Sequence, residues 1–390
     1  MTVIDRHYAS DDRARSVYQY LDLDVPPHAD ALTVTLGYDR TDAIIDLGLV
    51  GPDRFGGWSG SERSTVTVTP TWATPGYVPG VVRGSWQVIL GLHRVGPAGV
   101  TVAVGVGHDP VPRPAAPPMP SRRPRPRRRD LPATPGRAWL AADFHSHTVH
   151  SDGSLEIAEL AVLAASQGLD VLAVTDHNTV SHHPHLEAAG DHAGLLLLPG
   201  QEVTTDHGHA NCFGALPWID FRQPPDTWRA ATAAGGGVMA VNHPWAGECA
   251  WRLPLSEPAP LVEMWHSTWD LVDPTPLVDG GTFGTVPIGG SDFHRPGSGV
   301  FPGRPTTWVE CDDRSIDGVL DALRHGRVAI SATPAGPVLL RHDDELVAID
   351  ADGCELVVGD TTAHLTAVGR VVALAPAPEN TISTKEIGQI

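Results

Sequence analysis

From Trp139 onward, short apolar runs recur along the chain, and most of them end at a histidine or a carboxylate. The runs include WLAADF, DVLAVT, LLLLPGQ, VMAVN and VPIGGS, and helical segments separate several of them. One such segment, SLEIAELAVLAASQG, offers Ser154 as an N-cap and Gly168 as a stop. Non-alternating apolar strands with helices between them are typical of a parallel sheet covered on both faces. The pattern predicts a barrel-like α/β domain over residues 138–335.

The polar residues at the ends of these runs are of the types that bind metal ions. Six are histidines and three are carboxylates: His145, His147, Asp152, His177, Glu202, His209, His243, Asp292 and His294. The carboxyl ends of the strands in a parallel barrel converge on one face, so we expect these side chains to meet there. One metal takes about four protein ligands or fewer, so nine ligands predict two or three divalent ions. Mixed nitrogen and oxygen ligands suit Zn, Mn or Fe.

Several other chemistries are excluded by the composition. The only lysine is Lys385, close to the C-terminus, so a Walker phosphate loop and a Schiff-base mechanism are both ruled out. The sequence contains no G-x-S-x-G elbow and no HExxH helix motif. The net charge of −19 argues against general nucleic-acid affinity, although a nucleotide or short oligonucleotide stays open as a substrate. We therefore expect a small-molecule substrate; the sequence does not give the oligomeric state.

The cellular setting is also suggested by what the sequence lacks. The four cysteines form no CxxC pair, which predicts free thiols and a reducing cytoplasm. No run reaches 18 apolar residues and the N-terminus shows no apolar signal region, so we expect neither a membrane span nor a secretory signal.

Outside the α/β region, three further segments are predicted. Residues 1–108 contain short β-type runs such as STVTVTP and GVTVAVGV between turn residues, which indicates an all-β sandwich or jelly roll. Residues 109–137 are rich in proline and arginine and predict an extended linker. Eight arginines lie between 113 and 137, and they form either a solvated spacer lying on acidic neighbours, which we favour, or a hook for anions or nucleic acid. Residues 336–390 predict a few more strands and a loose tail.

The ordered motifs HSHTVHSDGS, VTDHNT, GQEVTTDHGHANCFG, NHP and GGSDFH resemble those of the PHP (polymerase and histidinol phosphatase) superfamily. The sequence around Glu202 and the later segment GRVAISATPAGP most resemble the carbaryl-esterase-type branch of this superfamily, the CehA/McbA-like metallohydrolases. The resemblance covers about residues 139–336. It implies a distorted (β/α)7 barrel with a trinuclear, sometimes binuclear, metal centre.

The resemblance also implies a division of the ligands. His145, His147, Glu202 and Asp292 would hold one metal, and Glu202 would bridge to a second, completed by His209 and His243. Asp152, His177 and His294 would hold a third. Some family members carry histidine at the position of Asp152. Two of the cations would then lower the pKa of a shared, bridging water, and the resulting hydroxide would attack the substrate.

Other residues near these motifs are candidates for catalysis or substrate binding. Asp176, beside His177, would orient a ligand or a water, with support of a ligand the favoured role, and His266 would donate a hydrogen bond to substrate. Six of the 11 tryptophans lie between 218 and 269, and Trp245 and Trp265 are the strongest candidates for a pocket wall, with barrel packing as the alternative. Arg252 and Arg295 would clamp a phosphate, with surface ion pairs as the favoured alternative.

Three functions remain open. The first is a multinuclear metal-dependent phosphoesterase for a small phosphomonoester or diester. The second is hydrolysis of a carboxyl ester or carbamate by the same centre, favoured by the branch resemblance and the tryptophan-rich stretch. The third is a PHP module that binds or regulates without catalysis, and the intact set of nine ligands argues against it.

Overall fold

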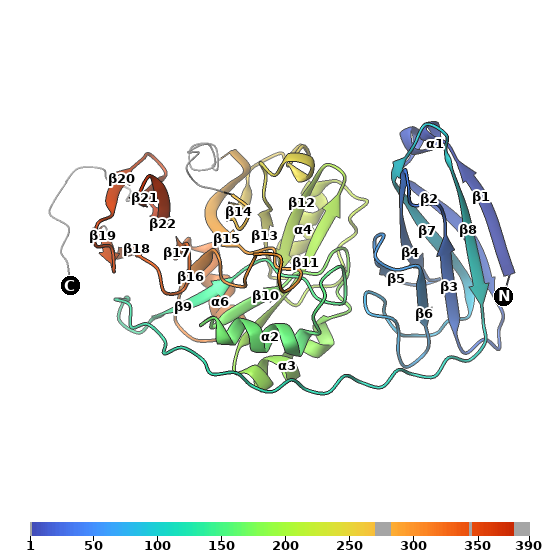
Figure 1. Ribbon diagram of the computed structural model, residues 1–390, viewed down its shortest axis with the longest axis horizontal. Coiled ribbons are helices and arrows are strands. Elements are labelled where there is room, and N and C mark those ends of the chain that lie inside the picture. The colour runs from blue at the N-terminus through green and yellow to red at the C-terminus, as the bar shows by residue number, and fades with distance from the viewer. Residues whose placement is uncertain (1, 270–281, 343–344, 378–390) are drawn as a thin grey trace. The chain divides into compact units, whose positions relative to one another are not determined.

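The computed structural model describes residues 2–269, 282–342 and 345–377, shown in Figure 1. The chain forms two compact units, the first made of Met1–Pro118 with two short loops, 149–152 and 176–182, and the second of the remaining residues. Each loop leaves the second unit and returns to it after only a few residues, so the chain itself ties these loops to the strands that flank them. Lys385 and the predicted tail lie outside the described residues.

The first unit is an antiparallel β-sandwich. One sheet has the order β1-β8-β3-β6 and the other β2-β7-β4-β5. Apolar residues of both sheets, among them Val34, Val102, Leu47 and Trp86, pack in one core. The elements are β1 (Thr2–Tyr8), α1 (Ser10–Arg15), β2 (Tyr18–Val25), β3 (Leu32–Gly37), β4 (Ala43–Val50), β5 (Phe55–Trp58), β6 (Thr65–Val68), β7 (Gly84–Val95) and β8 (Val100–Gly107).

The second unit is built on a twelve-stranded sheet with the order β15-β14-β13-β12-β11-β10-β9-β16-β17-β22-β21-β20. Its strands are β9 (Ala138–Asp143), β10 (Val171–Val174), β11 (Leu196–Thr205), β12 (Gly208–Phe213), β13 (Val238–Val241), β14 (Ala259–His266), β15 (Gly284–Gly290), β16 (Thr306–Cys311), β17 (Val328–Ser331), β20 (Glu355–Val358), β21 (Thr362–Ala367) and β22 (Arg370–Pro376). A separate hairpin is formed by β18 (Val338–His342) and β19 (Glu345–Ile349).

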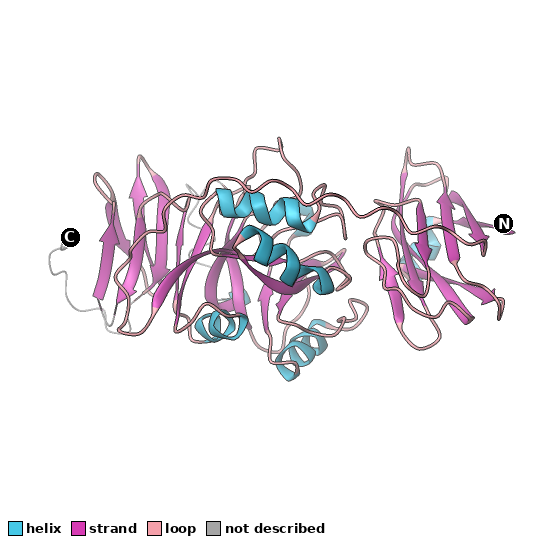
Figure 2. Ribbon diagram, turned by 90° about the horizontal axis from the view of Figure 1, so that it is seen from below, coloured by secondary structure: helices cyan, strands magenta, loops and turns pink. Residues whose placement is uncertain are grey.

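The central strands are apolar on both faces because both faces are covered. Along β10, Leu172 and Val174 pack in one core while Val171 and Ala173 pack in another, since successive side chains of a strand point to opposite faces. The first core includes residues of α2 (Ile157–Ser166) and α3 (Leu186–Ala193), and the second includes residues of α6 (Ile316–Arg324). A further helix, α4 (Pro225–Ala234), precedes β13. Figure 2 shows helices on opposite sides of the strands.

The predicted helix after the first motif is present, but its start differs from the prediction. Helix α2 begins at Ile157 with Glu156 as N-cap, whose N–H donates to the Glu159 carboxylate at 3.0 Å. Ser154 is not the cap, because it lies two residues before the N-cap and its hydroxyl is directed to the carbonyl of His294 at 3.4 Å. The helix is followed by Gly168 with a φ of 99°, as expected for a glycine stop.

The prediction of a mixed α/β domain is confirmed, whereas the distorted (β/α)7 barrel is not. Strands β9, β10 and β11 pair in parallel, as do β13, β14 and β15, but β12 is antiparallel to both of its neighbours and β16 is antiparallel to β9. Strands β15 and β16, at the two ends of this series of strands, are joined through a side chain. The Thr307 hydroxyl accepts the Gly289 N–H at 2.7 Å and donates to the Gly289 carbonyl at 2.9 Å. The described part of this unit has four α-helices, fewer than seven β/α units require.

The end of the linker lies on the second unit through ion pairs. Arg125 and Arg128 both contact the carboxylate of Asp170, whose side chain is 1% exposed. Arg129 pairs with Asp350, and Arg137 pairs with Asp312. These four arginines are therefore paired with acidic neighbours.

The predicted C-terminal strands continue the large sheet. Strand β22 pairs with β17, and β21 and β20 follow at the edge. None of the helices in the described part of the chain has both the length and the apolar character that a membrane crossing requires. All four cysteines are free thiols, as the absence of a CxxC pair predicts.

Candidate metal centre

The predicted ligands come from strand ends and the loops that follow them. His145 and His147 follow β9, Glu202 lies in β11, and His209 lies in β12. His243 follows β13, while Asp292 and His294 follow β15. Two of these ligands, His243 and Asp292, have positive φ values of 27° and 51°, which are uncommon for residues other than glycine. Such backbone persists only where the surroundings hold it, and it often marks functional sites.

The structure brings all nine predicted ligands together in four overlapping groups. Within each group the ligand atoms lie within 4.8 Å of one another. The groups are His147, Asp152, His177 and His294; His145, His243 and Asp292; His145, His147 and Glu202; and Glu202, His209 and His243. Compared with the division implied by the family resemblance, His147 also joins the third set and Asp292 also meets His243. Neighbouring groups share members, so the nine residues form one continuous set of candidate ligands.

Glu202 is the residue that joins these groups. Its Oε1 lies 3.3 Å from Nε2 of His145, 3.2 Å from Nδ1 of His209 and 3.5 Å from Nε2 of His243. Its Oε2 lies 3.5 Å from Nε2 of His147. The side chain is fully buried. The two oxygens of one carboxylate thus face different histidines, which is the arrangement that a bridging ligand requires.

Asp292 makes a second connection. Its Oδ1 lies 2.9 Å from Nε2 of His147 and 3.2 Å from Nε2 of His145. Its Oδ2 lies 3.2 Å from Nε2 of His266. Asp292 therefore contacts two predicted ligands with one oxygen and a supporting histidine with the other.

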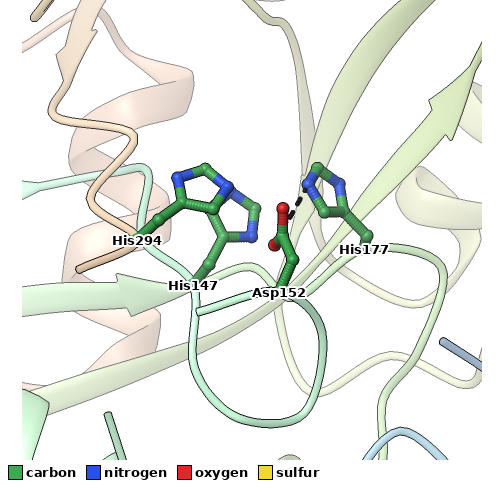
Figure 3. Close-up of side chains that lie close together, drawn as sticks. All are labelled: His147, Asp152, His177 and His294. Carbon is green, nitrogen blue, oxygen red and sulfur yellow. Dashed lines mark ion pairs between the residues drawn. The ribbon is translucent and has the colours of Figure 1, made fainter. Parts of the chain in front are cut away.

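The group formed by His147, Asp152, His177 and His294 is shown in Figure 3. The rings of His147 and His294 stack with centroids 4.2 Å apart, and Nε2 of His177 lies 3.5 Å from Oδ1 of Asp152. The four side chains point toward one another. Three imidazoles and one carboxylate make a donor set that suits zinc, manganese or iron.

The electrostatics of the buried cluster fit a cation. Burial lowers the pKa of His145, but Asp292, Glu202 and Glu263 outweigh this effect and raise that pKa well above its ordinary value. Burial raises the pKa of Asp292, but His145 and His147 outweigh it and hold the pKa well below its ordinary value. The negative field that favours an imidazolium would equally stabilise a divalent ion.

The buried Nε2 of His145 gives a direct test of whether a metal fits. This atom is buried and forms no hydrogen bond among the described residues, although two carboxylate oxygens lie 3.2 and 3.3 Å away. An uncompensated buried nitrogen costs about 1–3 kcal/mol unless something satisfies it. A metal bound by Nε2 would do so, and the residues therefore fit the implied centre.

The sequence analysis missed two buried residues that hold the ligands in place. Glu263 in β14 contacts Nδ1 of His145 at 3.0 Å and accepts the backbone N–H of His243 at 2.8 Å. The Nδ2 of Asn242 donates to Oε1 of Glu202 at 2.8 Å. A lone carboxylate inside the apolar run LVEMWH was the available signal for Glu263, because a buried charge needs a partner.

Asp176 and His266 both lie in supporting positions. Asp176 is buried, accepts a hydrogen bond from the Ser151 hydroxyl at 2.7 Å and lies 3.3 Å from Nδ1 of His182. His266 is 4% exposed and contacts Thr268 and Asp292. Asp176 thus joins the loops that carry Asp152 and His177, and His266 orients Asp292.

The two predicted pocket tryptophans have different surroundings. Trp265 packs in a core with Met264, Ile330 and Leu374, so the packing interpretation holds for it and the pocket-wall interpretation does not. Trp245 is half-buried, and its ring lies 5.4 Å from the rings of both Trp269 and Phe283. Trp269 in turn lies 5.6 Å from His266. Trp245, Trp269 and Phe283 thus form an aromatic cluster beside the metal centre.

The two predicted phosphate-binding arginines are exposed. Arg252 donates to the carbonyl of Gly247 at 2.9 Å, and Arg295 directly follows His294. Within residues 2–269, 282–342 and 345–377, neither side chain forms an ion pair. The surface ion pairs considered as their alternative role are therefore absent from this part of the chain.

Comparisons with known proteins support part of the resemblance. Residues 143–249 match the model of the PHP domain family. A stretch of 64 residues is 39% identical to a 5'-3' exoribonuclease of Haemophilus influenzae, and this match spans 16% of the chain and 23% of that relative's length.

Two solved structures are also similar to the chain. One is a two-domain protein of Bacteroides vulgatus described as containing a predicted PHP-like metal-dependent phosphoesterase, 19% identical, covering 66% of this chain and 92% of that one with a TM-score of 0.43. The other is an amidohydrolase of Chromobacterium violaceum, 17% identical, covering 50% of this chain and 98% of that one with a TM-score of 0.34. Likenesses this distant decide neither fold nor function.

The PHP match covers seven of the nine predicted ligands, from His145 through His243. Asp292 and His294 lie beyond the match in sequence, but each shares a ligand group with residues inside it. Asp292 lies with His145 and His243, and His294 lies with His147, Asp152 and His177. The family match and the ligand groups together support a metal-dependent hydrolase.

Proposed function

We propose that the chain is a multinuclear metal-dependent phosphoesterase that acts on a small phosphomonoester or diester. The observation that carries this proposal is the position of Glu202, which belongs to two ligand groups. Its Oε1 faces His145, His209 and His243, and its Oε2 faces His147. Two or three divalent ions, of zinc, manganese or iron, would be held by the nine ligands. They would supply Lewis acidity toward both water and the ester group.

The protein's own residues perform the positioning. Glu202 keeps neighbouring groups of ligands together, and Asn242 fixes its Oε1 through a hydrogen bond of 2.8 Å. His266 orients Asp292 through Oδ2. Arg295, exposed and next to His294, offers a guanidinium that can pair with two phosphate oxygens at once.

The test is a screen of the metal-loaded protein against p-nitrophenyl phosphate, bis(p-nitrophenyl) phosphate and 1-naphthyl esters and carbamates. We expect metal-dependent release of p-nitrophenol from a phosphate ester, lost in Glu202→Gln. Hydrolysis of the naphthyl substrates alone would reject the phosphoesterase in favour of the alternative below.

A carboxylester or carbamate hydrolase with the same centre is the second candidate. It is favoured by the aromatic cluster of Trp245, Trp269 and Phe283 beside His266, since such rings would bind a planar apolar group. The resemblance to the carbaryl-esterase-type branch points the same way. A non-catalytic module is not favoured, because all nine positions carry residues of metal-binding type and these residues lie together in groups.

A further inference from the structure

Residues 119–137, the part of the linker that lies on the second unit, are anchored at several points. The Nε2 of His192 in α3 lies 2.8 Å from the carbonyl oxygen of Pro120. A few residues later, Arg125 and Arg128 pair with the buried Asp170. Figure 1 shows this segment passing α2 and α3. Arg122 and Arg123 therefore lie between two fixed points of the chain.

These two arginines line a pocket of about 390 Å³. The other lining residues come from the linker, from α2 and its approach, and from the loop after β15. The full set is Pro120, Ser121, Arg122, Arg123, Leu155, Glu159, Val162, Leu163 and Pro296. Five of these residues are apolar or proline, two are arginines and one is a glutamate.

The charges of Arg122 and Arg123 are not used within the described chain. Arg125, Arg128, Arg129 and Arg137 of the same linker each pair with a carboxylate, whereas Arg122 and Arg123 form no ion pair or hydrogen bond among the described residues. One carboxylate, Glu159, also lines the pocket, and it accepts the N–H of Glu156 at 3.0 Å. The two arginines outnumber it, so the pocket carries an excess positive charge.

The pocket lies close to the metal centre. Leu155 is three residues after Asp152, and Pro296 is two residues after His294. Because a chain spans at most about 3.6 Å per residue, the Cα atoms of these pocket residues lie within about 11 Å of the Cα atoms of those ligands. The two walls are also joined directly, since the N–H of Ser154 donates to the carbonyl of His294 at 2.8 Å.

We propose that Arg122 and Arg123 form a phosphate-binding subsite beside the metal centre. Its ligand is a phosphate group other than the one being hydrolysed, either a second phosphate on the same substrate or free inorganic phosphate. As a subsite for substrate, it rests on the proposed phosphoesterase function. Guanidinium groups suit this ligand because each can bind two phosphate oxygens, and the linker holds the pair in place.

The experiment compares two double variants of the full-length protein. Arg122→Ala/Arg123→Ala removes the subsite, and Arg113→Ala/Arg127→Ala removes the same charge from linker positions that do not line the pocket. Substrates are bis(p-nitrophenyl) phosphate, with one phosphate, and 5'-phosphorylated thymidine dinucleotide and trinucleotide, with several. Binding of inorganic phosphate is measured separately by calorimetry, which needs no turnover.

We expect Arg122→Ala/Arg123→Ala to lower kcat/KM on the oligonucleotides by about 10-fold or more, without changing bis(p-nitrophenyl) phosphate hydrolysis. Loss of inorganic phosphate binding with unchanged oligonucleotide kinetics would identify free phosphate as the ligand. Equal losses in both double variants, or no loss in either assay, would overturn the subsite. Failure of every phosphate ester to react would reject the proposed function instead, while the calorimetry would still decide whether the arginines bind phosphate.

Discussion

The Nδ1 atom of His145 lies 3.0 Å from Oε1 of Glu263, while Oε2 of the same carboxylate accepts the backbone N–H of His243 at 2.8 Å. The buried Glu263 side chain thus holds the ring orientation of His145 and the backbone of His243. With Nδ1 occupied, the Nε2 of His145 is the nitrogen left to bind a metal. A carboxylate in this position also raises the basicity of the imidazole.

Replacing Glu263 should therefore weaken metal binding. We expect Glu263→Ala to lower the affinity for the metal by about 10- to 100-fold, as the loss of a ligand's supporting partner commonly does. Glu263→Gln should lose less, because its amide oxygen can still accept from Nδ1 of His145. Affinity is measured by competition with a chromophoric chelator, with circular dichroism as the check on folding. Equal affinities for wild type and Glu263→Ala would show that Glu263 has no positioning role.

Glu202→Gln tests the bridging role of that carboxylate. The substitution keeps the size of the side chain but removes the charge that faces four histidines. We expect turnover to fall by at least about 100-fold with the fold intact. The control is Glu248→Gln, an exposed glutamate in the short helix Gly247–Cys249, which should leave turnover unchanged. Near-normal turnover of Glu202→Gln at saturating metal would contradict the bridge.

The metal content follows from the four overlapping ligand groups. We expect two to three divalent ions per chain in protein purified without chelator, measured by elemental analysis. Removing them should abolish hydrolysis and lower thermal stability, because bound ions favour the folded state. One ion or none per chain would rule out a multinuclear centre.

The sequence predicted the mixed α/β domain because its strand signals are local. The apolar runs around Val171 and Val238 are buried on both faces, and this burial is what their composition requires. The antiparallel placement of β12 and β16 was not predictable, since pairing direction depends on contacts between segments far apart in the chain. The closure by Thr307 and Gly289 depends on one hydroxyl, and such a contact leaves no pattern in the sequence.

The ligand set followed from residue type and position at strand ends, and the structure brings all nine residues together. The residues that support the ligands were harder to predict from the sequence, because Glu263 and Asn242 act through the ligands they contact and carry no motif of their own. Trp265 is the opposite case, a residue that the sequence placed at the site and the structure places elsewhere. Its place at a strand end in a tryptophan-rich stretch suggested a pocket wall, but the ring packs in a core with Met264, Ile330 and Leu374.

Asp170 offers a test of the linker's attachment. Its carboxylate is buried, meets Arg125 and Arg128, and accepts the backbone N–H of Ala141 at 3.1 Å. Asp170→Ala leaves that buried N–H without an acceptor and removes the ion pairs of Arg125 and Arg128, so we expect the free energy of unfolding to fall by about 2–4 kcal/mol. Arg128→Ala should lose less than about 1 kcal/mol, since Arg128 is 47% exposed. Urea denaturation measures both, and equal effects would show that the backbone contact contributes little.

Arg295 and Trp245 separate phosphate from carbonyl chemistry. If phosphate is the substrate group, Arg295→Ala or Arg252→Ala should lower kcat/KM for a phosphoester by about 10-fold, equivalent to about 1.4 kcal/mol, because a guanidinium pairs with phosphate oxygens. Hydrolysis of a neutral aryl ester should then be nearly unchanged. Trp245→Ala should have the opposite profile, since it removes a ring from the aromatic cluster with Trp269 and Phe283.

The matched control for the tryptophan variant is Trp218→Ala, which removes an indole that packs on Phe221 rather than on the aromatic cluster beside His266. All four variants are assayed with a phosphoester and a naphthyl ester under the same metal loading. A phosphoester rate that ignores both arginines, together with an ester rate that collapses only in Trp245→Ala, would transfer the assignment to the ester or carbamate hydrolase. That outcome has a physical basis in this chain, because a neutral substrate adds no negative charge to a protein that already carries −19.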